Sequence, residues 1–412
     1  MAKETEMISL KSAPRWLSIA YALHGALFIL PTLMLFYAFK GVSMGDFLLI
    51  QGIANLSIFV LEIPTGYIGD LFSRKKTLII GTLFWILGYL FWIFGSGFAI
   101  ILLGELIWSM AIAFISGTLE AYLYDLLKKN HKEKNFHKKY AKMKMLNDLA
   151  LTISALSGAF VYQFLGPTIP LWASIVCLIA STVILLLLPD VPESKRIVAK
   201  DKSKWKDILD ISKYAMKHPE IKWLMLFPAL YGTFTFMMLW GLQSVMVLRA
   251  LPVFVFGFVT TANSFLRTFW SGISGKILEK FHLSGVLIFS CIVMIMGAFG
   301  SSLAAYVPIW MVYLCLALMM FTSSSVVLSR ISASVLINHR IKSDERATVL
   351  SVASMVNRAF SGIGLICLKP LFDGIGVGPT FMVSALLLIP ILICARHLYK
   401  MKLSTFKGLI KE

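Results

Sequence analysis

The most constraining feature of the chain is a series of twelve apolar segments of membrane-spanning length. A bilayer core of about 30 Å requires roughly 20 apolar residues in a spanning helix. Charged residues and turn signals separate the segments, and their continuous apolar runs exclude the alternating pattern of an outer-membrane barrel. The sequence therefore predicts an all-α membrane protein with twelve transmembrane helices. The predicted spans are 16–39, 47–69, 77–96, 99–127, 143–165, 168–189, 221–248, 252–275, 284–302, 306–336, 347–371 and 377–398.

Basic residues are distributed unevenly over the loops between these spans. The chain has 39 lysines and arginines against 21 acidic residues, and most of the basic residues lie near the two ends and in alternate loops. The positive-inside rule assigns these loops to the cytoplasm. We therefore predict a multi-pass protein of the cytoplasmic (inner) membrane with both termini in the cytoplasm. The basic loops are expected to contact anionic lipid headgroups, and nucleic acid is not expected as a partner.

The longest polar stretch separates six spans from six. It predicts an N-terminal six-helix bundle over 1–189, a cytoplasmic linker over 190–220 and a C-terminal six-helix bundle over 221–412. Apolar residues near helical spacing among the linker's lysines suit a short helix on the membrane surface, and a solvated charged linker is the alternative. All five cysteines lie in apolar segments and are interpreted as small core residues, with no metal site or disulfide framework expected.

The two halves show traces of an internal repeat. A shift of 206 residues places Thr65–Lys75 (TGYIGDLFSRK) over Ser271–Phe281 (SGISGKILEKF) and aligns two glycines and a cation in each segment. The same shift pairs Ala141 with Ala347 at the starts of spans five and eleven. Equal shifts at equivalent loops predict two parallel, pseudo-symmetric repeats.

The loop between spans two and three carries the most specific motif. Its glycines permit close backbone approach, and its cations are expected to hold the loop at the inner leaflet. Here the chain resembles the major facilitator superfamily of secondary transporters, whose loop pattern is Gly-x-x-x-Asp-(Arg/Lys)-x-Gly-(Arg/Lys)-(Arg/Lys). Gly66, Asp70, Arg74 and Lys75 fit this pattern, whereas Leu71 replaces a cation and Ser73 replaces the second glycine.

The resemblance implies two six-helix bundles that rock about a central cavity and expose it alternately to each side of the membrane. It also implies that Asp70 docks on the N-terminal end of helix eleven, where Arg346 is a candidate partner. The alternative is a loop acid that only shapes the turn. Two further signatures of the family, an arginine in helix four and a Gly-Pro pattern within helix five, are absent from this chain.

Charged residues within the predicted spans are sorted by sign. Each is costly in a bilayer, by about 2.5–3.5 kcal/mol on insertion scales, and is therefore a candidate functional group. The acids belong to the N-terminal half and the arginines to the C-terminal half: Glu62, Glu105, Glu120 and Asp148, against Arg267, Arg330 and Arg358. The family fold places helix two beside eleven and helix five beside eight. We therefore hypothesise an interdomain gate in which Glu62 pairs with Arg358 and Asp148 with Arg267.

Polar residues of helices one, four, seven and ten form a second candidate group, because the family lines its cavity with these helices. On a helical wheel, Glu105, Ser109, Ser116 and Glu120 form one stripe on helix four. A carboxyl in an apolar site holds its proton more tightly than one in water, which makes Glu105 and Glu120 candidates for proton binding. Interhelical hydrogen bonding is the alternative, and it is the favoured interpretation for His24. The remaining cavity candidates are Arg330, Tyr231 and Gln243.

The sequence contains no nucleotide-binding loop, dinucleotide fingerprint, metal-ligand cluster or hydrolase motif, so neither an enzyme nor a cofactor is predicted. The predicted function is secondary active transport of a small amphipathic or anionic solute, by alternating access, with proton coupling, a slight preference for efflux and a monomeric state. A lipid or lysolipid flippase on the same fold is one alternative. A membrane-embedded transferase is another, disfavoured because the predicted outer loops are only a few residues long.

Overall fold

The computed structural model describes residues 8–71, 73–191, 217–340 and 346–400, and within these ranges the side chains of 63, 66–71, 219, 339–340, 346–348 and 400 are not described. The described residues form helices and connecting turns, with no β-strand among them. The elements are α1 (Ala13–His24), η1 (Leu30–Thr32), α2 (Leu33–Phe39), α3 (Met44–Leu71), α4 (Arg74–Phe94), α5 (Gly97–Ile115), α6 (Thr118–Lys129), η2 (Glu133–Asn135), α7 (Phe136–Leu165), α8 (Ile169–Leu187), α10 (Pro219–Leu248), α11 (Val253–Leu303), α12 (Ile309–Ser324), α13 (Val326–Arg340), α14 (Arg346–Ile375), α15 (Val377–Ser384), η3 (Ala385–Leu387) and α16 (Leu388–Lys400).

Ten helical stretches among the described residues are long and apolar enough to cross a membrane. Two differences account for the number being ten rather than twelve. Span one is divided among α1, η1 and α2, and spans eight and nine form the single element α11 of 51 residues. A straight helix of that length would measure about 77 Å, far more than a bilayer core. The backbone of His282, with φ 54° and ψ −177°, interrupts α11. The prediction of an all-α membrane protein is confirmed.

Three predicted continuous spans are interrupted near their middle. The sequence predicts one helix over 99–127 for span four, but α5 ends at Ile115 and α6 begins at Thr118, with Gly117 at φ +75° between them. A positive φ is incompatible with an α-helix of L-residues and is least costly at glycine. The helical wheel therefore does not extend across this break, and the predicted stripe of Glu105, Ser109, Ser116 and Glu120 is wrong as a single face. Spans one and ten are likewise interrupted, at residues 25–29 and 325.

The residues group into two compact units. The first comprises Met1–Ser43, Ser57–Asp201 and Pro252–Thr261, and the second comprises Met44–Leu56, Lys202–Leu251 and Ala262–Glu412. The units follow the two halves of the sequence except for two segments, 44–56 of α3 and 252–261 of α11, which belong to the opposite unit. A shift of 206 residues carries 44–56 onto 250–262, which contains 252–261. The exchanged segments are thus equivalent in the predicted repeat, and the division at 189 and 221 remains a prediction.

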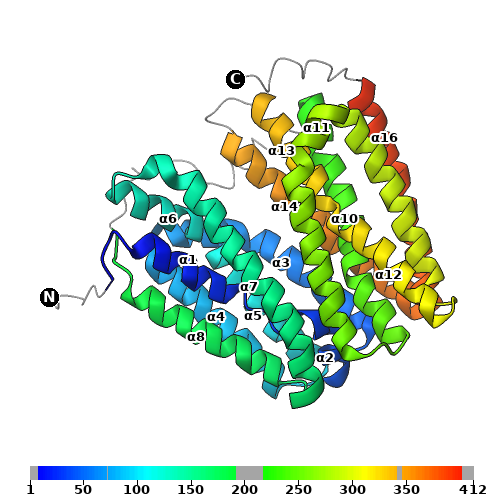
Figure 1. Ribbon diagram of the computed structural model, residues 1–412, viewed down its shortest axis with the longest axis horizontal. Coiled ribbons are helices and arrows are strands. Elements are labelled where there is room, and N and C mark those ends of the chain that lie inside the picture. The colour runs from blue at the N-terminus through cyan, green and yellow to red at the C-terminus, as the bar shows by residue number, and fades with distance from the viewer. Residues whose placement is uncertain (1–7, 72, 192–216, 341–345, 401–412) are drawn as a thin grey trace. The chain divides into compact units, whose positions relative to one another are not determined.

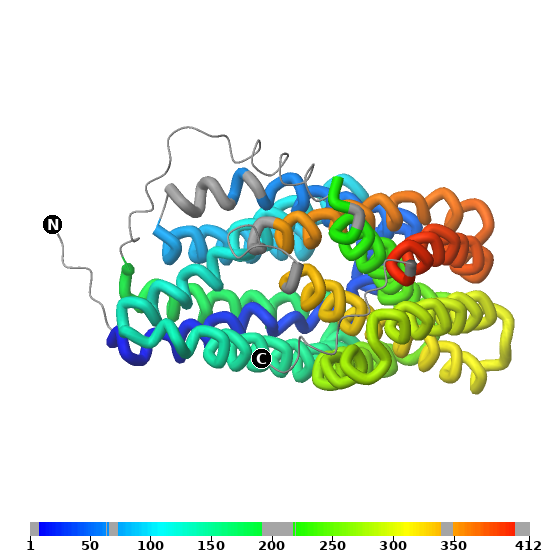
Figure 2. The backbone as a smooth tube through the Cα atoms, turned by 90° about the horizontal axis from the view of Figure 1, so that it is seen from above, coloured from blue at the N-terminus to red at the C-terminus, as the bar shows by residue number. Residues whose placement is uncertain are grey.

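In the first unit, α1 packs against α7 and α8, and α4 packs against α5, α6 and α8. These helices run nearly parallel or antiparallel to one another (Figures 1 and 2). A small residue of α7 permits close approach to the segment that follows α1, because a Cβ on Gly158 would overlap the carbonyl group of Phe28. Helix α7 begins seven residues before the predicted fifth span, so part of the basic stretch 128–144 is helical.

In the second unit, α10 lies among α12, α13, α14 and α16 (Figure 1). It is the most buried of the candidate spans, with 83% of its apolar window inside the protein. The exchanged segment of α3 crosses α14 at a glycine pair, because a Cβ on Gly52 would lie 2.8 Å from the carbonyl oxygen of Gly362, and the converse distance is also 2.8 Å. Such backbone approach is typical of packing between transmembrane helices, where small residues permit close contact.

Two smaller predictions have separate outcomes. Cys315 and Cys394 are buried, but Cys367 is exposed, so the prediction that all five cysteines are core residues is wrong for Cys367. It lies on a face of α14 that apolar character alone does not distinguish from the core, since lipid and protein interior are both apolar. Most of the linker, including the suggested surface helix, falls at 192–216, outside the described residues.

Candidate functional site

A cavity of about 480 Å³ lies entirely within the second unit. The apolar residues of its wall come largely from α10 and include Leu224, Met225 and Phe236. The polar residues are, in addition to serines and a threonine, Asn55, Arg267, Arg330, Asn357 and Arg358. This volume is within the range of small-molecule binding sites, which are commonly apolar with a few placed polar groups.

The charge of this cavity has one sign. Three guanidinium groups reach its wall from three helices: Arg267 from α11, Arg330 from α13 and Arg358 from α14. Among the residues that the structure describes, no aspartate or glutamate lines this cavity. Arg330, predicted as a cavity residue, lies on this wall, and the two predicted gate arginines line the same cavity. Several positive charges close together in a membrane protein favour binding of an anion.

Arg330 is held by a short relay that joins three helices. Its Nη2 donates a hydrogen bond to Oδ1 of Asn357 at 2.6 Å, and Nδ2 of Asn357 donates to the carbonyl oxygen of Pro228 at 3.1 Å. Gly232 of α10 makes room for the relay, because a Cβ there would overlap Nδ2 of Asn357. The described residues provide no carboxylate partner for Arg330.

Glu105 occupies a different environment in the first unit. Its side chain is 1% exposed, and the hydroxyl of the fully buried Tyr37 donates a hydrogen bond to Oε2. The Tyr37 ring lies edge-on to Trp92 at 5.6 Å, and Tyr89 lies next to Trp92. Glu105 is therefore a buried carboxyl in an aromatic environment, at the interface of α2, α4 and α5. This arrangement can store a proton or stabilise the helix contacts.

His24 forms an interhelical contact, as the favoured interpretation proposed. Its Nε2 lies 2.9 Å from Oγ1 of Thr82, and its ring stacks on Trp85 with 5.6 Å between centroids. The residue is 3% exposed, and its Nδ1 has no hydrogen-bond partner among the described residues.

Glu120 lies on the exposed first turn of α6 rather than beside Glu105. The hydroxyl of Tyr140 donates to its Oε1. Nearby, Nζ of Lys144 is 3.2 Å from the hydroxyl of Tyr21 and lies over the rings of Tyr21 and Tyr140. Glu120 is thus part of a polar surface network, and its separation from Glu105 follows from the helix break at Gly117.

The loop motif is described only in part. The side chains of Gly66, Asp70 and Arg346 lie outside the described residues, so the proposed docking of Asp70 stays a prediction. Arg74 forms a salt bridge with Asp125 of α6 at 2.5 Å and donates to the carbonyl oxygen of Ala121 at 2.6 Å.

Lys75 also forms a contact within the protein, because its Nζ donates to the carbonyl oxygen of Leu188 at 2.7 Å. Ser73, which replaces the second glycine of the motif, caps α4 by accepting a hydrogen bond from the backbone N–H of Lys76. Arg74 and Lys75 therefore tie the start of α4 to its neighbours, a contribution that the expected contact with the inner leaflet did not include.

The predicted gate stays a prediction. Glu62 and Asp148 belong to the first unit, and Arg267 and Arg358 to the second. Within the first unit, Oε1 of Glu62 accepts a hydrogen bond from Ser116 at 3.5 Å, beside the break in span four.

Tyr231 and Gln243 are not among the residues that line the cavity. Tyr231 is fully buried, and its hydroxyl lies 2.6 Å from Oγ of Ser325, where α12 gives way to α13. Gln243 is also buried. Both residues are on α10, and the neighbouring helices of the second unit cover most of the surface of α10.

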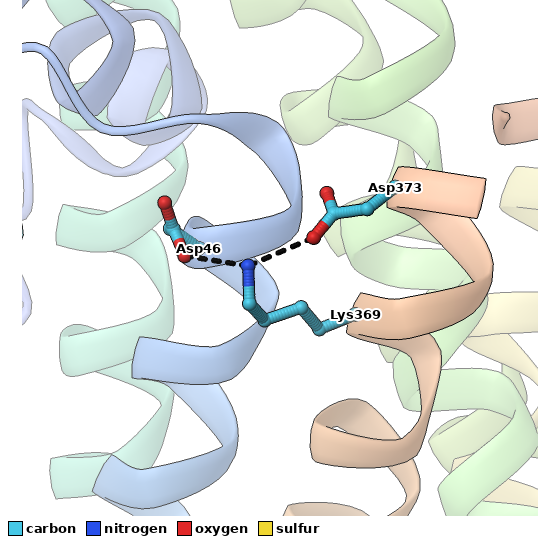
Figure 3. Close-up of polar contacts among 3 residues, drawn as sticks. All are labelled: Asp46, Lys369 and Asp373. Atoms are coloured by element: carbon cyan, nitrogen blue, oxygen red, sulfur yellow. Dashed lines mark hydrogen bonds and ion pairs between the residues drawn. The ribbon is translucent and has the colours of Figure 1, made fainter.

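A second charged cluster joins the first turn of α3 to the C-terminal part of α14 (Figure 3). Nζ of Lys369 lies 2.7 Å from Oδ1 of Asp46 and 2.8 Å from Oδ2 of Asp373. All three residues belong to the second unit. Their side chains are 29%, 30% and 49% exposed, in the order Lys369, Asp46, Asp373.

Sequence reasoning missed several of these partners. Asn357 stands next to Arg358 in the sequence, but an uncharged amide carries no signal of function by itself. Asp125 stands at the very end of span four, and Tyr37 resembles any other aromatic residue of an apolar segment. A polar residue within three or four positions of a charged one on the same helix would have been a usable signal for Ser361, but not for partners on another helix.

Comparisons with known proteins agree with this architecture. The family model of the Major Facilitator Superfamily matches residues 17–365. No curated protein sequence matches the chain significantly. Three similar solved structures are the nucleoside transporter NupG, a bacterial homologue of the human lysosomal transporter Spinster in an inward-facing and unoccupied conformation, and the human organic anion transporter MFSD10.

The identities of these three structures to the chain are 14%, 11% and 14%, and their TM-scores are 0.77, 0.71 and 0.60, in the same order. The alignments cover 95%, 97% and 94% of this chain and 100%, 99% and 100% of the other. At these identities the structural likeness shows the fold alone, whereas the family match covers most of the sequence. The chain belongs to the Major Facilitator Superfamily.

Proposed function

We propose that the protein is a secondary transporter of a small organic anion with an apolar part, and that the anionic group binds in the arginine-lined cavity. One observation carries this proposal: the described residues that line a cavity of about 480 Å³ include three guanidinium groups and no carboxylate. Arginine binds carboxylates and phosphates through paired, charge-assisted hydrogen bonds. The apolar residues that α10 contributes to the wall would contact the apolar part of the solute.

The three transporter structures with this fold carry different names: a nucleoside transporter, a homologue of a lysosomal transporter and an organic anion transporter. The charge of the described lining residues favours the organic anion among these, because three guanidinium groups on one cavity wall attract a negatively charged solute more strongly than a neutral one. We propose the topology inferred from the basic loops, with both termini in the cytoplasm and the cytoplasmic membrane as the location. Alternating access and the gate pairs Glu62–Arg358 and Asp148–Arg267 belong to the same proposal.

Proton coupling is the second part of the proposal, and Glu105 is its candidate residue. The side chain of Glu105 is 1% exposed and accepts a hydrogen bond from Tyr37, and a carboxyl group is able to bind and release a proton. Tyr37 and Glu105 lie on neighbouring helices, so a rearrangement of either helix would change this environment. We propose export as the direction of transport. The direction is measured by comparing transport by protein inserted in the two orientations in the vesicle membrane.

The test uses purified protein in proteoliposomes and a panel of aromatic carboxylates, each paired with its neutral carboxamide. Counterflow measures transport, and the shift in melting temperature measures binding, since a ligand of the folded state stabilises it. A fluorescent lysolipid arm tests flipping, and a pH gradient of either sign tests proton coupling. Transport of carboxamides in preference to carboxylates, or transport of the lysolipid alone, would contradict the proposal.

We predict that Arg330→Gln lowers the affinity for carboxylates by about tenfold or more. A hydrogen bond to a charged group contributes about 1.5–3 kcal/mol, and 1.4 kcal/mol corresponds to a factor of ten. Arg396→Gln is the matched control, because Arg396 is exposed on α16 and does not line the cavity. An equal loss in both variants would show that total charge, not the cavity, determines binding.

A further inference from the structure

We propose that Asn357 is a specificity-determining residue: it positions Arg330 through a neutral hydrogen bond and so keeps the guanidinium charge available to an anionic substrate. This inference rests on the proposed function, and it assigns the discrimination between an anion and its neutral analogue to one side chain. Asn357 acts through Arg330 and is therefore a positioning residue.

The orientation of the Asn357 amide follows from its two partners. Pro228 offers a carbonyl oxygen, which only accepts, and Arg330 offers N–H groups, which only donate. The amide nitrogen therefore faces Pro228 at 3.1 Å, and the amide oxygen faces Arg330 at 2.6 Å. Both contacts are satisfied in one orientation only, so the amide is locked and the guanidinium has a fixed acceptor.

The chemistry of the acceptor determines the charge of the site. An aspartate at 357 would have nearly the same shape, but it would form an ion pair with Arg330 and cancel its charge. An amide oxygen accepts one hydrogen bond and leaves the positive charge in place. Arginine has five N–H donors, of which Asn357 uses one on Nη2, so the planar group can bind a carboxylate through its other donors.

The packing around the relay supports a positioning role. Gly232 allows the approach, since a Cβ there would overlap Nδ2 of Asn357 and lie 3.6 Å from Nη2 of Arg330. The relay is thus fitted between α10, α13 and α14, which all contribute to the cavity wall. A change at Gly232 or Asn357 would move the guanidinium without removing it.

The decisive variants are Asn357→Asp and Asn357→Leu, measured with the paired carboxylate and carboxamide panel. We expect N357D to lower carboxylate affinity by about tenfold or more, because its carboxylate neutralises Arg330, while carboxamide affinity changes by less than about threefold. N357L removes the anchor but keeps the charge, so it should weaken both members of a pair and retain a preference for the carboxylate.

The matched control is Asn55→Asp, which adds a carboxylate to the same cavity from α3. Asn55 donates to the carbonyl oxygen of Gln51 in its own helix and has no described contact with Arg330. Its loss of carboxylate affinity should be smaller than that of N357D. A purely structural role for Asn357 would instead weaken both members of each pair equally in N357D and N357L, and that result would overturn the proposal.

A measurement without substrate keeps the two proposals separable. Phenylglyoxal modifies guanidinium groups, and mass spectrometry quantifies the adduct on Arg330 in the full-length protein. We expect N357D to reduce the adduct on Arg330 by severalfold relative to N357L. If no panel member stabilises the wild type, the proposed function fails. If carboxylates bind but N357D leaves both their affinity and the Arg330 adduct unchanged, only the role of Asn357 fails.

Discussion

At the scale of single residues, each unit contains an ionisable side chain that forms a hydrogen bond with an uncharged partner. The carboxyl of Glu105 is buried and accepts a hydrogen bond from a phenol, Tyr37. The guanidinium of Arg330 lines a cavity and donates to an amide, Asn357. Neither partner carries a full charge, so neither neutralises the group that it orients. Each partner therefore orients its group through a hydrogen bond and forms no ion pair with it.

We predict that Tyr37→Phe lowers the melting temperature, because it leaves an oxygen of the buried Glu105 without its donor. An unsatisfied buried polar group costs about 1–3 kcal/mol. Adding Glu105→Leu to Tyr37→Phe should recover part of the loss, since it removes the buried polar group as well. The measurement is the melting temperature of both single variants and the double variant. Strictly additive losses would show that the contact contributes no coupling energy.

Sequence reasoning identifies charged residues well and their neutral partners poorly. Glu105 and Arg330 were predictable because a charge in a spanning segment is costly and so carries information. Asn357 and Tyr37 carry no such cost, and their significance depends on which helices come together. Tyr231 is absent from the wall of the described cavity, and its hydroxyl lies near Oγ of Ser325 instead, because a polar group on a buried helix can form a hydrogen bond with a neighbouring helix.

At the scale of elements, the interruptions of the helices shape the molecule as much as their lengths do. Span four breaks at Gly117, which separates the buried Glu105 from the exposed Glu120. Span ten is divided at Ser325, next to the hydroxyl of Tyr231. Hydropathy predicts that a segment crosses the membrane, but it does not report where a backbone leaves the helical conformation, because apolar residues continue through the break.

We predict that Gly117→Ala destabilises the protein by about 1–2 kcal/mol. Gly117 has φ +75°, and a Cβ added to it would meet no atom within 4 Å, so the cost is the backbone conformation alone. Gly272→Ala is the matched control, because that helical glycine has equal space but no positive φ. Alanine there should be neutral or stabilising by up to about 1 kcal/mol. Equal melting temperatures for the two variants would contradict the strain at Gly117.

At the scale of the whole molecule, hydropathy predicted the all-α membrane class, and the loop motif with the twelve spans carried the family resemblance; both are confirmed. The exchange of segments 44–56 and 252–261 between units was not predictable, because hydropathy is the same whichever unit a helix joins. In the second unit, the exchanged part of α3 is held by the glycine crossing at Gly52 and by the salt bridges of Lys369.

We predict that Lys369→Met loosens the exchanged segment of α3. The substitution removes the cation between Asp46 and Asp373 and leaves two acids near each other, at a cost of about 1 kcal/mol for partly exposed groups. Hydrogen exchange of a peptide covering 44–56 should increase. Lys280→Met, also in the second unit, is the control. Adding Asp46→Asn and Asp373→Asn should restore protection, and failure to do so would show that packing alone holds the segment.

The exchange of the α3 and α11 segments has consequences for fragments of the chain and for its evolutionary origin. A fragment cut at the central linker would carry a helix end that its partner fragment needs, so each half should require the other as a folding template. If the ancestor was a single repeat that paired with a copy of itself, the same exchange would have been a domain swap between two subunits. Fusion of the two copies into one polypeptide would then have made that reciprocal dependence permanent.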